Sequence, residues 1–375
     1  MKKMYFGFFT LFMAGIFFPG ENCKKPVRVA TANATQTDGP YVLYKNGKAI
    51  IRYIMEEDGW KVMKNDTMDA ANRSAITVSV ATEDSGKTFP VTLKAELKNE
   101  QSEYNDVKKQ FVVSDVEGNF KYFKKLLQVN GVIDSSYNWT FGDGHLVLTG
   151  DFVDRGMQVT EVLWLIYSLE DKAKQAGGYV HFILGNHEIM NMSGDLRYLH
   201  PKYKETAMLL GESYVNLLGE NSELGMWLRT KNITEKVGEI LYTHAGISSE
   251  MNRMKIDLHS LNDIARPWYP DSTYRYTDLR LDTIFSDAGP FWYRGYYKSP
   301  SATVVQQIDS TMQKFGVKYI ATGHTILGDT IRVLYNGRVF NTDVHHASGK
   351  SEGLLIEDNK FYRVNVSGEK FLIKE

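Results

Sequence analysis

Short apolar segments that each end in a glycine-containing polar cluster are the feature that most constrains the fold of this sequence. Five such segments lie between residues 111 and 325. The clusters that follow them are Asp115-Val-Glu117-Gly118-Asn119, Gly150-Asp151-Phe-Val-Asp154-Arg155-Gly156, Gly185-Asn186-His187-Glu188, His244-Ala-Gly-Ile and Gly323-His324-Thr325. In open α/β sheets, ligands bind beyond the carboxyl ends of the strands. The pattern therefore predicts that these clusters, which are distant in sequence, meet in one site.

Strand-like and helical stretches alternate around the clusters. Apolar runs such as Phe111-Val-Val-Ser and Leu146-Val-Leu-Thr are separated by longer stretches with helical character, among them Glu161-Val-Leu-Trp-Leu-Ile-Tyr-Ser-Leu169. This alternation is typical of α/β proteins, in which helices cover a sheet. The sequence therefore predicts an α/β fold from about residue 110 onward.

The clusters contain side chains that bind divalent metals. Six of them are expected to converge: Asp115, Glu117, Asp151, Asn186, His244 and His324. Six ligands of these types suit two divalent cations that share a bridging carboxylate, whereas a structural zinc site normally has four. The only cysteine is Cys23, so a cysteine-rich zinc or iron–sulfur site is excluded. The histidines outside the clusters are interpreted as structural.

These motifs resemble those of the calcineurin-like metallophosphoesterase superfamily. The phrase Gly-Asp-x-Val-Asp-Arg-Gly followed by Gly-Asn-His-Glu is similar to its phosphoprotein phosphatase branch, and the stretches 190–198 and 289–296 resemble the Shewanella-like phosphatases. The resemblance implies a four-layer metallophosphatase sandwich, with two mixed β-sheets flanked by helices. This domain would span residues 108–375 and carry a helical insert at 193–230.

The resemblance also implies a role for each site residue. Asp115 and Glu117 would hold the first metal, Asp151 would bridge, and the second metal would be held by Asn186, His244 and His324. His187 would be the general acid, oriented by Asp154. Arg155 and Arg294 would bind the phosphoryl oxygens, and a metal-bridging hydroxide would attack phosphorus.

Glu117 departs from the pattern of the family, which has histidine at this position. With Glu117 as a ligand, the first site would hold three carboxylates and no nitrogen, which favours Mn²⁺, with Mg²⁺, Fe and Zn²⁺ as alternatives. We expect an active enzyme, because Asp154, Arg155, His187 and Arg294 are all present.

The implied reaction is hydrolysis of phosphomonoesters, with phosphoprotein, including phosphotyrosine, as the substrate class. The alternatives are a hydrolase of small phosphoesters or dinucleoside polyphosphates, and a non-catalytic metal-binding surface protein. Trp292, Tyr293, Tyr296 and Tyr297 would either line a pocket for an aromatic phosphoester or belong to the core. Arg197 is expected at the surface, with a substrate contact as the alternative. The net charge of −1 predicts no nucleic-acid partner.

The N-terminal third has a different character. Lys2, Lys3 and the apolar run up to Phe18 predict a signal peptide or lipoprotein leader over residues 1–22, and hence export to the periplasm. Lipidation of Cys23 would provide the only membrane attachment. Residues 23–37 are expected to form a linker, and residues 38–105 a small β-rich module with hairpins. The partner of this module is unknown.

Overall fold

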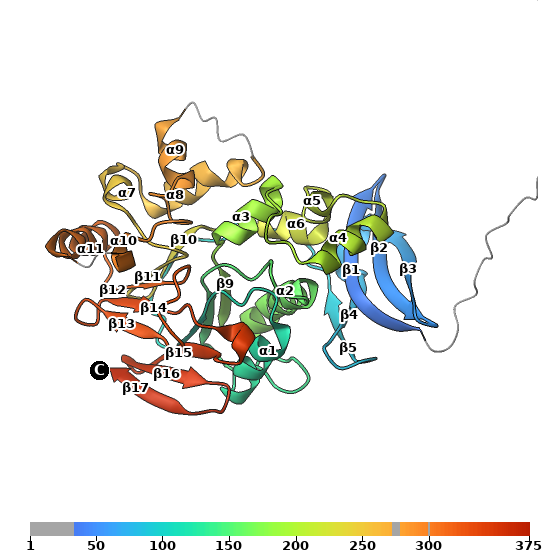
Figure 1. Cartoon of the computed structure of the whole chain (residues 1–375), viewed down its shortest axis with the longest axis horizontal. Coiled ribbons are helices and arrows are strands. Elements are labelled where there is room, and N and C mark those ends of the chain that lie inside the picture. The colour runs from blue at the N-terminus through green and yellow to red at the C-terminus, as the bar shows by residue number, and fades with distance from the viewer. Residues whose placement is uncertain (1–33, 272–277, 299–300) are drawn as a thin grey trace, which may run out of the picture.

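The computed structural model describes residues 34–271, 278–298 and 301–375. The predicted leader and Cys23 lie outside the described residues. Within them, two six-stranded sheets form the centre of the molecule (Figure 1). The first has the order β17-β16-β15-β7-β8-β9 and the second β13-β14-β12-β11-β10-β6.

Both sheets are mixed. In the first, β7 (Gln110–Val113), β8 (His145–Leu148) and β9 (Tyr179–Phe182) are parallel. They are followed antiparallel by β15 (Glu352–Glu357), β16 (Lys360–Asn365) and β17 (Lys370–Lys374). In the second, β11 (Ile240–Thr243), β12 (Tyr319–Thr322) and β14 (Val339–Asn341) are parallel. Its other strands are β6 (Glu103–Tyr104), β10 (Thr234–Val237) and β13 (Arg332–Leu334).

An apolar core joins the facing surfaces of the two sheets. Val112 and Val147 of the first sheet belong to one buried cluster with Ile240, Tyr242 and Phe340 of the second. Helices cover the outer faces. On one side lie α1 (Phe120–Val129) and α2 (Val159–Gln175). On the other side are α7 (Ser249–Arg253), α8 (Leu258–Ala265), α9 (Leu279–Phe285), α10 (Gly295–Lys298) and α11 (Ala302–Phe315). The predicted four-layer metallophosphatase sandwich is confirmed.

Short helices connect the two sheets between residues 186 and 228. They are α3 (Asn186–Ser193), α4 (Pro201–Leu210), α5 (Tyr214–Leu217) and α6 (Glu223–Leu228). Elsewhere in the described residues there are three 3₁₀ helices, at Ala70–Ala75, Arg266–Trp268 and His346–Ser348. None of the helices in the described parts of the chain is long and apolar enough to cross a membrane.

The N-terminal region is β-rich, as predicted. The antiparallel strands β1 (Thr35–Lys45), β2 (Lys48–Glu57) and β3 (Trp60–Asp69) form a sheet of their own. A hairpin of β4 (Thr77–Ala81) and β5 (Thr88–Thr92) follows. Asn46 and Gly47 connect β1 to β2 with φ of 51° and 72°. These angles suit the tight turn expected between two twisted strands.

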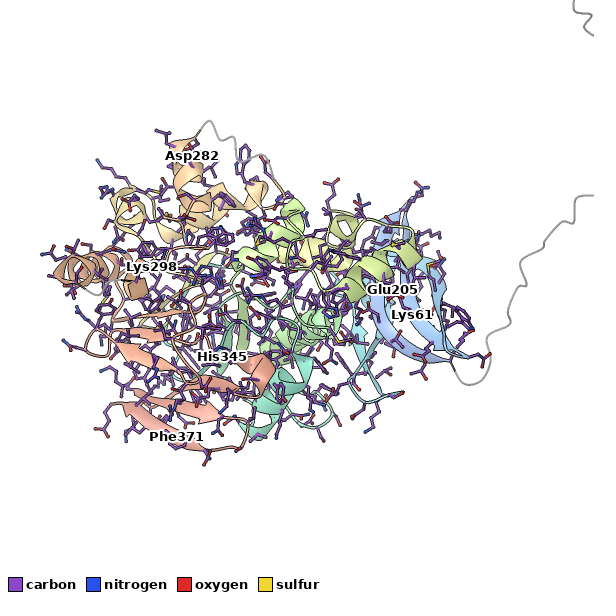
Figure 2. All side chains as sticks on the ribbon, viewed as in Figure 1. Lys61, Glu205, Asp282, Lys298, His345 and Phe371 are labelled. Atoms are coloured by element: carbon purple, nitrogen blue, oxygen red, sulfur yellow. The ribbon has the colours of Figure 1, made fainter. Side chains whose placement is uncertain are left out.

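Buried contacts attach this β-rich region to the sandwich. The indole Nε1 of Trp164 on α2 donates to the carbonyl oxygen of Pro40 at 2.9 Å. Glu223 on α6 accepts hydrogen bonds from the hydroxyls of Tyr44 and Tyr167 and pairs with Arg73. At the surface, Lys61 of β3 lies beside Glu205 of α4 (Figure 2). Side chains of β1 and β2 therefore share one apolar core with α2.

Candidate active site

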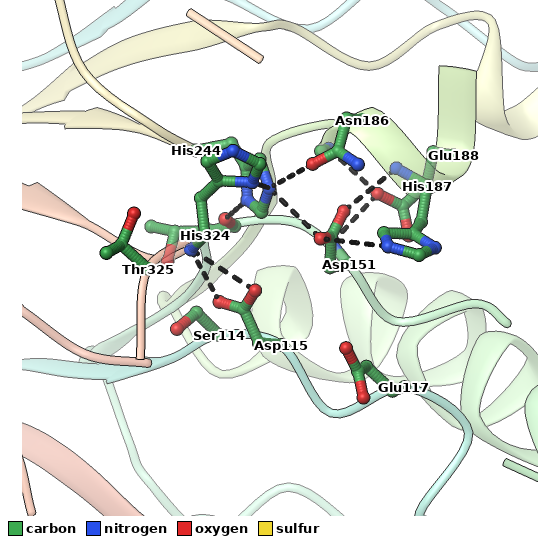
Figure 3. A network of polar contacts seen from close by, with 12 residues as sticks. Ser114, Asp115, Glu117, Asp151, Asn186, His187, Glu188, His244, His324 and Thr325 are labelled. Atoms are coloured by element: carbon green, nitrogen blue, oxygen red, sulfur yellow. Dashed lines mark hydrogen bonds and ion pairs between the residues drawn. The ribbon is translucent and has the colours of Figure 1, made fainter. Parts of the chain in front are cut away.

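The five polar clusters lie together at the carboxyl ends of the strands (Figure 3). Asp115 follows β7 and Asp151 follows β8, while His244 and His324 follow β11 and β12. Asn186 is the first residue of α3, which begins after β9. Within each sheet the arrangement follows from the topology, because parallel neighbouring strands end at the same edge. Packing of the two sheets against each other brings the two edges together.

The backbone around the site is tightly constrained. Asp115, Asp151 and His324 adopt positive φ of 51°, 61° and 64°. Residues other than glycine rarely adopt this conformation, and such residues concentrate at functional sites. Gly323 permits the close approach of two strand ends, because a Cβ atom there would collide with the Asp115 carboxylate.

Four of the predicted ligands converge on one point. One ligand atom each from Asp151, His244 and His324 lies within 4.8 Å of the others, and all three residues are buried. His244 Nε2 is 2.9 Å from Asn186 Oδ1, 3.1 Å from Asp151 Oδ2 and 3.2 Å from His324 Nδ1. His244 Nδ1 donates to the carbonyl oxygen of Thr149 at 2.8 Å. This bond fixes the ring so that Nε2 faces the cluster. Burial disfavours the charged form of His244, but Asp151 outweighs it and raises the pKa to about 9.

The donor set fits a divalent cation. His324 Nε2 is buried and has no hydrogen-bond partner among the described residues. Burial and the neighbouring His244 lower the pKa of His324 to about 2, which keeps the imidazole neutral, as a metal ligand must be. Neutral imidazole, carboxylate and amide oxygen are all ligands of divalent transition metals.

The predicted ligands of the first metal have different surroundings. Both carboxylate oxygens of Asp115 accept from the backbone N–H of His324, at 3.1 and 3.2 Å. Burial raises the pKa of Asp115 to about 7, and the charge of Asp151 adds to this effect. The Glu117 carboxylate is set apart from the imidazoles (Figure 3) and pairs with the guanidinium of Arg155. The role of Glu117 as a metal ligand stays a prediction.

A buried histidine–carboxylate pair lies beside the ligand cluster. His187 Nδ1 donates to Asp154 Oδ2 at 2.7 Å. His187 Nε2 lies 3.8 Å from Asp151 Oδ2 and 3.5 Å from a guanidinium nitrogen of Arg155. Burial disfavours the imidazolium, but Asp151 and Asp154 outweigh it and raise the pKa of His187 to about 9. The Nε2–H group is therefore available as a proton donor at neutral pH.

The two predicted phosphate-binding arginines contact different loops of the site. Arg155 lies over the ring of Tyr198, 5.2 Å from its centroid, and its side chain is 47% exposed. Arg294 donates to the carbonyl oxygen of His324 at 2.9 Å and to Thr325 Oγ1 at 3.0 Å. Both guanidinium groups thus lie next to the ligand-bearing loops.

Of the four aromatic residues near position 295, one lies in the core and the other three are partly buried against it. Tyr296 is completely buried and its hydroxyl bonds to Ile247, so it belongs to the core. The Trp292 ring lies edge-on to His324, with centroids 5.8 Å apart. Tyr293 and Tyr297 bond through their hydroxyls to Gln307 and Thr322.

The histidines interpreted as structural have partners away from the clusters. His145 and His181 contact each other, and His181 also contacts Glu235. The other four each contact one neighbouring group. His200 accepts from the backbone N–H of Lys202, and His259 pairs with Asp263. His345 pairs with Asp329, and His346 contacts the hydroxyl of Ser351. Arg197 pairs with Asp195, and its side chain is 64% exposed.

One positioning residue escaped the sequence analysis. Glu188 is fully buried, and its carboxylate accepts from the backbone N–H groups of Asp151, Phe152 and Gly185 at 2.8–2.9 Å. These bonds tie the loop after β8 to the start of α3. Glu188 is part of the Gly-Asn-His-Glu motif, so the sequence did mark it. The sequence could not show that its carboxylate binds backbone N–H groups of the loop after β8.

Comparison with known proteins agrees with this geometry. The sequence pattern of the family described as calcineurin-like phosphoesterase matches residues 109–327. The chain belongs to the calcineurin-like phosphoesterase family. A crystal structure of the cold-active protein-tyrosine phosphatase of a psychrophilic Shewanella species is similar, with 34% identity and a TM-score of 0.80. The similarity covers 90% of this chain and 99% of that one.

Curated relatives are more distant and are matched over part of their length. Shewanella-like protein phosphatase 2 of Arabidopsis thaliana is 24% identical over 302 residues, which are 68% of this chain and 75% of that protein. Shewanella-like protein phosphatase 1 of Plasmodium berghei is 26% identical over 238 residues, 60% of this chain and 64% of that protein. Together with the family match, these similarities identify this calcineurin-like phosphoesterase as a metal-dependent phosphatase.

Proposed function

We propose that this calcineurin-like phosphoesterase is a dinuclear metal phosphatase that hydrolyses phosphomonoesters of proteins, with phosphotyrosine as the preferred substrate. The observation that carries the proposal is the buried His187–Asp154 pair, which lies directly beside the converging ligands Asp151 and His244. A proton donor next to a metal-ligand cluster is the arrangement that cleavage of a phosphate ester requires.

Two cations would be held by the predicted ligands. Asp151, Asn186, His244 and His324 would hold one of them, and Asp115 and Asp151 would contribute to the other. When bound, two divalent cations would lower the pKa of a water molecule, so that hydroxide is available at neutral pH, and would withdraw charge from the phosphoryl oxygens. We propose Mn²⁺ as the preferred ion, because carboxylate oxygens predominate on the Asp115 side.

His187 would donate its Nε2 proton to the departing ester oxygen. Asp154 holds Nδ1, so the ring cannot turn Nε2 away from Asp151 and Arg155. The hydrogen bond also stabilises the charged imidazolium before the proton is transferred. General acid catalysis matters most for esters whose leaving group is a poor anion, such as a tyrosine or serine side chain.

Arg155 and Arg294 would bind the phosphoryl oxygens. A guanidinium group can donate two parallel hydrogen bonds to a phosphate. Arg155 is now paired with Glu117, so a substrate phosphate would have to compete with this carboxylate. Arg294 has only backbone and hydroxyl acceptors among the contacts described here, so no carboxylate competes for it.

The preference for phosphotyrosine is supported by similarity and by aromatic rings. The protein with 34% identity is described as a protein-tyrosine phosphatase. In this chain the Tyr198 ring lies 5.1 Å from the ring of His187, and Trp292 lies next to His324. Partly exposed rings at these places would offer stacking partners to a phenyl phosphate.

A second candidate is hydrolysis of dinucleoside polyphosphates. A symmetrical bis(5'-nucleosyl)-tetraphosphatase of Buchnera aphidicola is 29% identical over 146 residues, 37% of this chain. The similarity covers less of the chain than that to the tyrosine phosphatase, so we rank this substrate second.

Hydrolysis of p-nitrophenyl phosphate tests the proposal. The purified full-length chain would be stripped of metal and reloaded with Mn²⁺, Mg²⁺, Fe²⁺ or Zn²⁺ separately. Asp151→Asn should abolish the restored activity, and Asp171→Asn, at a half-exposed carboxylate remote from the cluster, should not. Phosphotyrosine peptide, phosphoserine peptide and diadenosine tetraphosphate would then be compared. Faster hydrolysis of the dinucleotide would establish the second candidate.

Export, either as a periplasmic protein or as a lipoprotein anchored at Cys23, is a further part of the proposal. It is supported by Lys2, Lys3 and the apolar run up to Phe18. Cell fractionation with radiolabelled palmitate would test it. Label in the membrane fraction that is lost in Cys23→Ser would support an anchor, and unlabelled periplasmic protein would support a cleaved signal peptide.

A further inference from the structure

A buried carboxylate outside the family motifs lies next to the candidate active site. Asp343 follows β14 and is only 4% exposed. It lies beyond the segment 109–327 that matches the family. Among the described residues, no hydrogen bond or ion pair to its carboxylate is found. A buried carboxylate without such partners is costly, so a native structure normally supplies a counter-charge.

The strand register places Asp343 beside the ligand loops. In the parallel pair of β12 and β14, Thr322 is opposite Asn341. The backbone N–H of Thr342 donates to the Thr322 carbonyl oxygen at 2.7 Å, and this bond belongs to the same last pair of the register. Asp343 is the next residue after Thr342, so it begins the segment that leaves β14 where β12 leads into His324.

The same segment also contacts the loop that carries Asp115. Thr342 Oγ1 donates to Ser114 Oγ at 3.0 Å, and the residues next to these two are Asp343 and Asp115. The backbone N–H of His324 donates to the Asp115 carboxylate. Asp115 and Asp343 each stand one residue beyond the Ser114–Thr342 contact, and Asp115 is the first charged group among the electrostatic neighbours of Asp343.

The electrostatic surroundings of Asp343 match this placement. Burial raises its pKa well above the usual range, and the negative charges of Asp115, Glu117 and Asp151 raise it further. The only cation among its main electrostatic neighbours is Arg155, and that guanidinium is already paired with Glu117. Asp115 and Asp343 are therefore left in need of positive charge, whereas His244 and His187 outweigh burial and lower the pKa of Asp151.

We infer that Asp343 is a ligand of the first metal ion, together with Asp115 and Asp151, and that Glu117 serves as the counter-ion of Arg155. This inference rests on the proposed dinuclear function. It replaces the family histidine by a carboxylate from a different strand. The resulting site has oxygen ligands alone, which suits a hard cation such as Mn²⁺ or Mg²⁺.

Metal binding without substrate tests the inference. Metal-free protein would be equilibrated with Mn²⁺ by dialysis, and the bound ion counted by mass spectrometry and titrated by calorimetry. The natural chain should bind two ions. Asp343→Asn should weaken one of the two sites by about 10-fold or more. Glu117→Gln should keep both sites, as should the matched control Asp329→Asn, whose carboxylate is exposed and pairs with His345.

Thermal unfolding separates a ligand from a structural residue. If Asp343 is a ligand, Asp343→Asn removes charge repulsion from the metal-free protein, so its midpoint temperature should rise. The increase produced by Mn²⁺ should become smaller. If Asp343 had a purely structural role, Asp343→Asn would lower the midpoint temperature both without and with Mn²⁺. This result would overturn the inference, and it can be obtained even with a variant that folds poorly.

Two binding results would also contradict the inference. Unchanged affinity of both sites in Asp343→Asn would exclude the residue as a ligand. If Glu117→Gln lost one ion while Asp343→Asn kept both, Glu117 and not Asp343 would be the ligand of the first metal ion. Failure of the proposed function would give a different result. In that case the natural chain would bind two ions but hydrolyse no phosphate ester, and the role of Asp343 as a ligand would still stand.

Discussion

His187 Nδ1 lies 2.7 Å from Asp154 Oδ2, and both side chains are buried. This contact fixes the orientation of the imidazole, so that its other nitrogen, Nε2, points toward Asp151 and Arg155. The chemistry of the site therefore depends on a carboxylate that itself contacts no ligand of the predicted metal centre among the described contacts.

Asp154→Asn should impair the hydrolysis of esters with poor leaving groups. The amide cannot stabilise the imidazolium, so protonation of the departing oxygen becomes slower. We expect kcat for phenyl phosphate to fall by about 10²- to 10⁴-fold. The decrease should be smaller for p-nitrophenyl phosphate, whose leaving group needs little protonation. Steady-state kinetics with substituted phenyl phosphates measure this difference, with the exposed Asp84→Asn as control. An equal decrease for all leaving groups would assign Asp154 a purely structural role.

Glu117→Gln should strengthen the binding of phosphate. Glu117 now pairs with Arg155, and loss of its charge would make the guanidinium available to a phosphoryl group. A partly exposed ion pair contributes up to about 1 kcal/mol, so the inhibition constant of inorganic phosphate should fall by about two- to fivefold. Competitive inhibition assays measure it, with the exposed Glu96→Gln as control. Weaker phosphate inhibition in Glu117→Gln would argue that Glu117 holds a metal instead.

Glu223→Ala should destabilise the attachment of the β-rich region. Glu223 is fully buried and is the common partner of Arg73, Tyr44 and Tyr167. Its removal leaves a partly buried guanidinium without its carboxylate, which costs about 3–5 kcal/mol for a buried pair. Urea unfolding would show a lower midpoint, whereas Glu220→Ala, at an exposed position nearby, should have little effect. Equal stability of the two variants would contradict a structural role for this contact.

The stabilising effect of Glu100 should depend on pH. Burial opposes the charged form of Glu100, but Lys231 outweighs it and lowers the pKa of Glu100 from 4.5 to about 2. A carboxyl group whose pKa is lower in the folded than in the unfolded state stabilises the fold fully above the unfolded value. This stabilisation is lost as the pH falls through the folded value.

Glu100→Gln tests this dependence. At neutral pH the variant should be less stable than the natural chain by about 2 kcal/mol, the value of a hydrogen bond between charged groups. The difference should shrink between about pH 4.5 and pH 2. Denaturant unfolding at several pH values measures it. A difference that does not change with pH would show that the charge of Glu100 is not its source.

The sequence by itself determined the α/β class and most of the site. Asp115, Asp151, Asn186, His244 and His324 could be grouped because each follows a short apolar run, and the ends of parallel strands lie at one edge of their sheet. Packing of the two sheets then brings the edge with Asp115 and Asp151 to the edge with His244 and His324. The turn at Asn46 and Gly47 was likewise predictable, because its residues alone favour the required backbone conformation.

Only the tertiary structure decided the partners of Glu117, Glu188 and Asp343. Glu117 stands two residues after the predicted ligand Asp115, where the family has a ligand histidine. In the structure it nevertheless pairs with Arg155, a residue of another loop. Asp343 carries no motif, and it lies near Asp115 only because β14 pairs with β12 and Thr342 contacts Ser114, 228 positions earlier. Local sequence patterns determine how a segment folds, whereas pairing between distant strands depends on the packing of the whole chain. For this reason the sequence predicted which kinds of side chain bind metal, but it could not predict all the residues that surround the site.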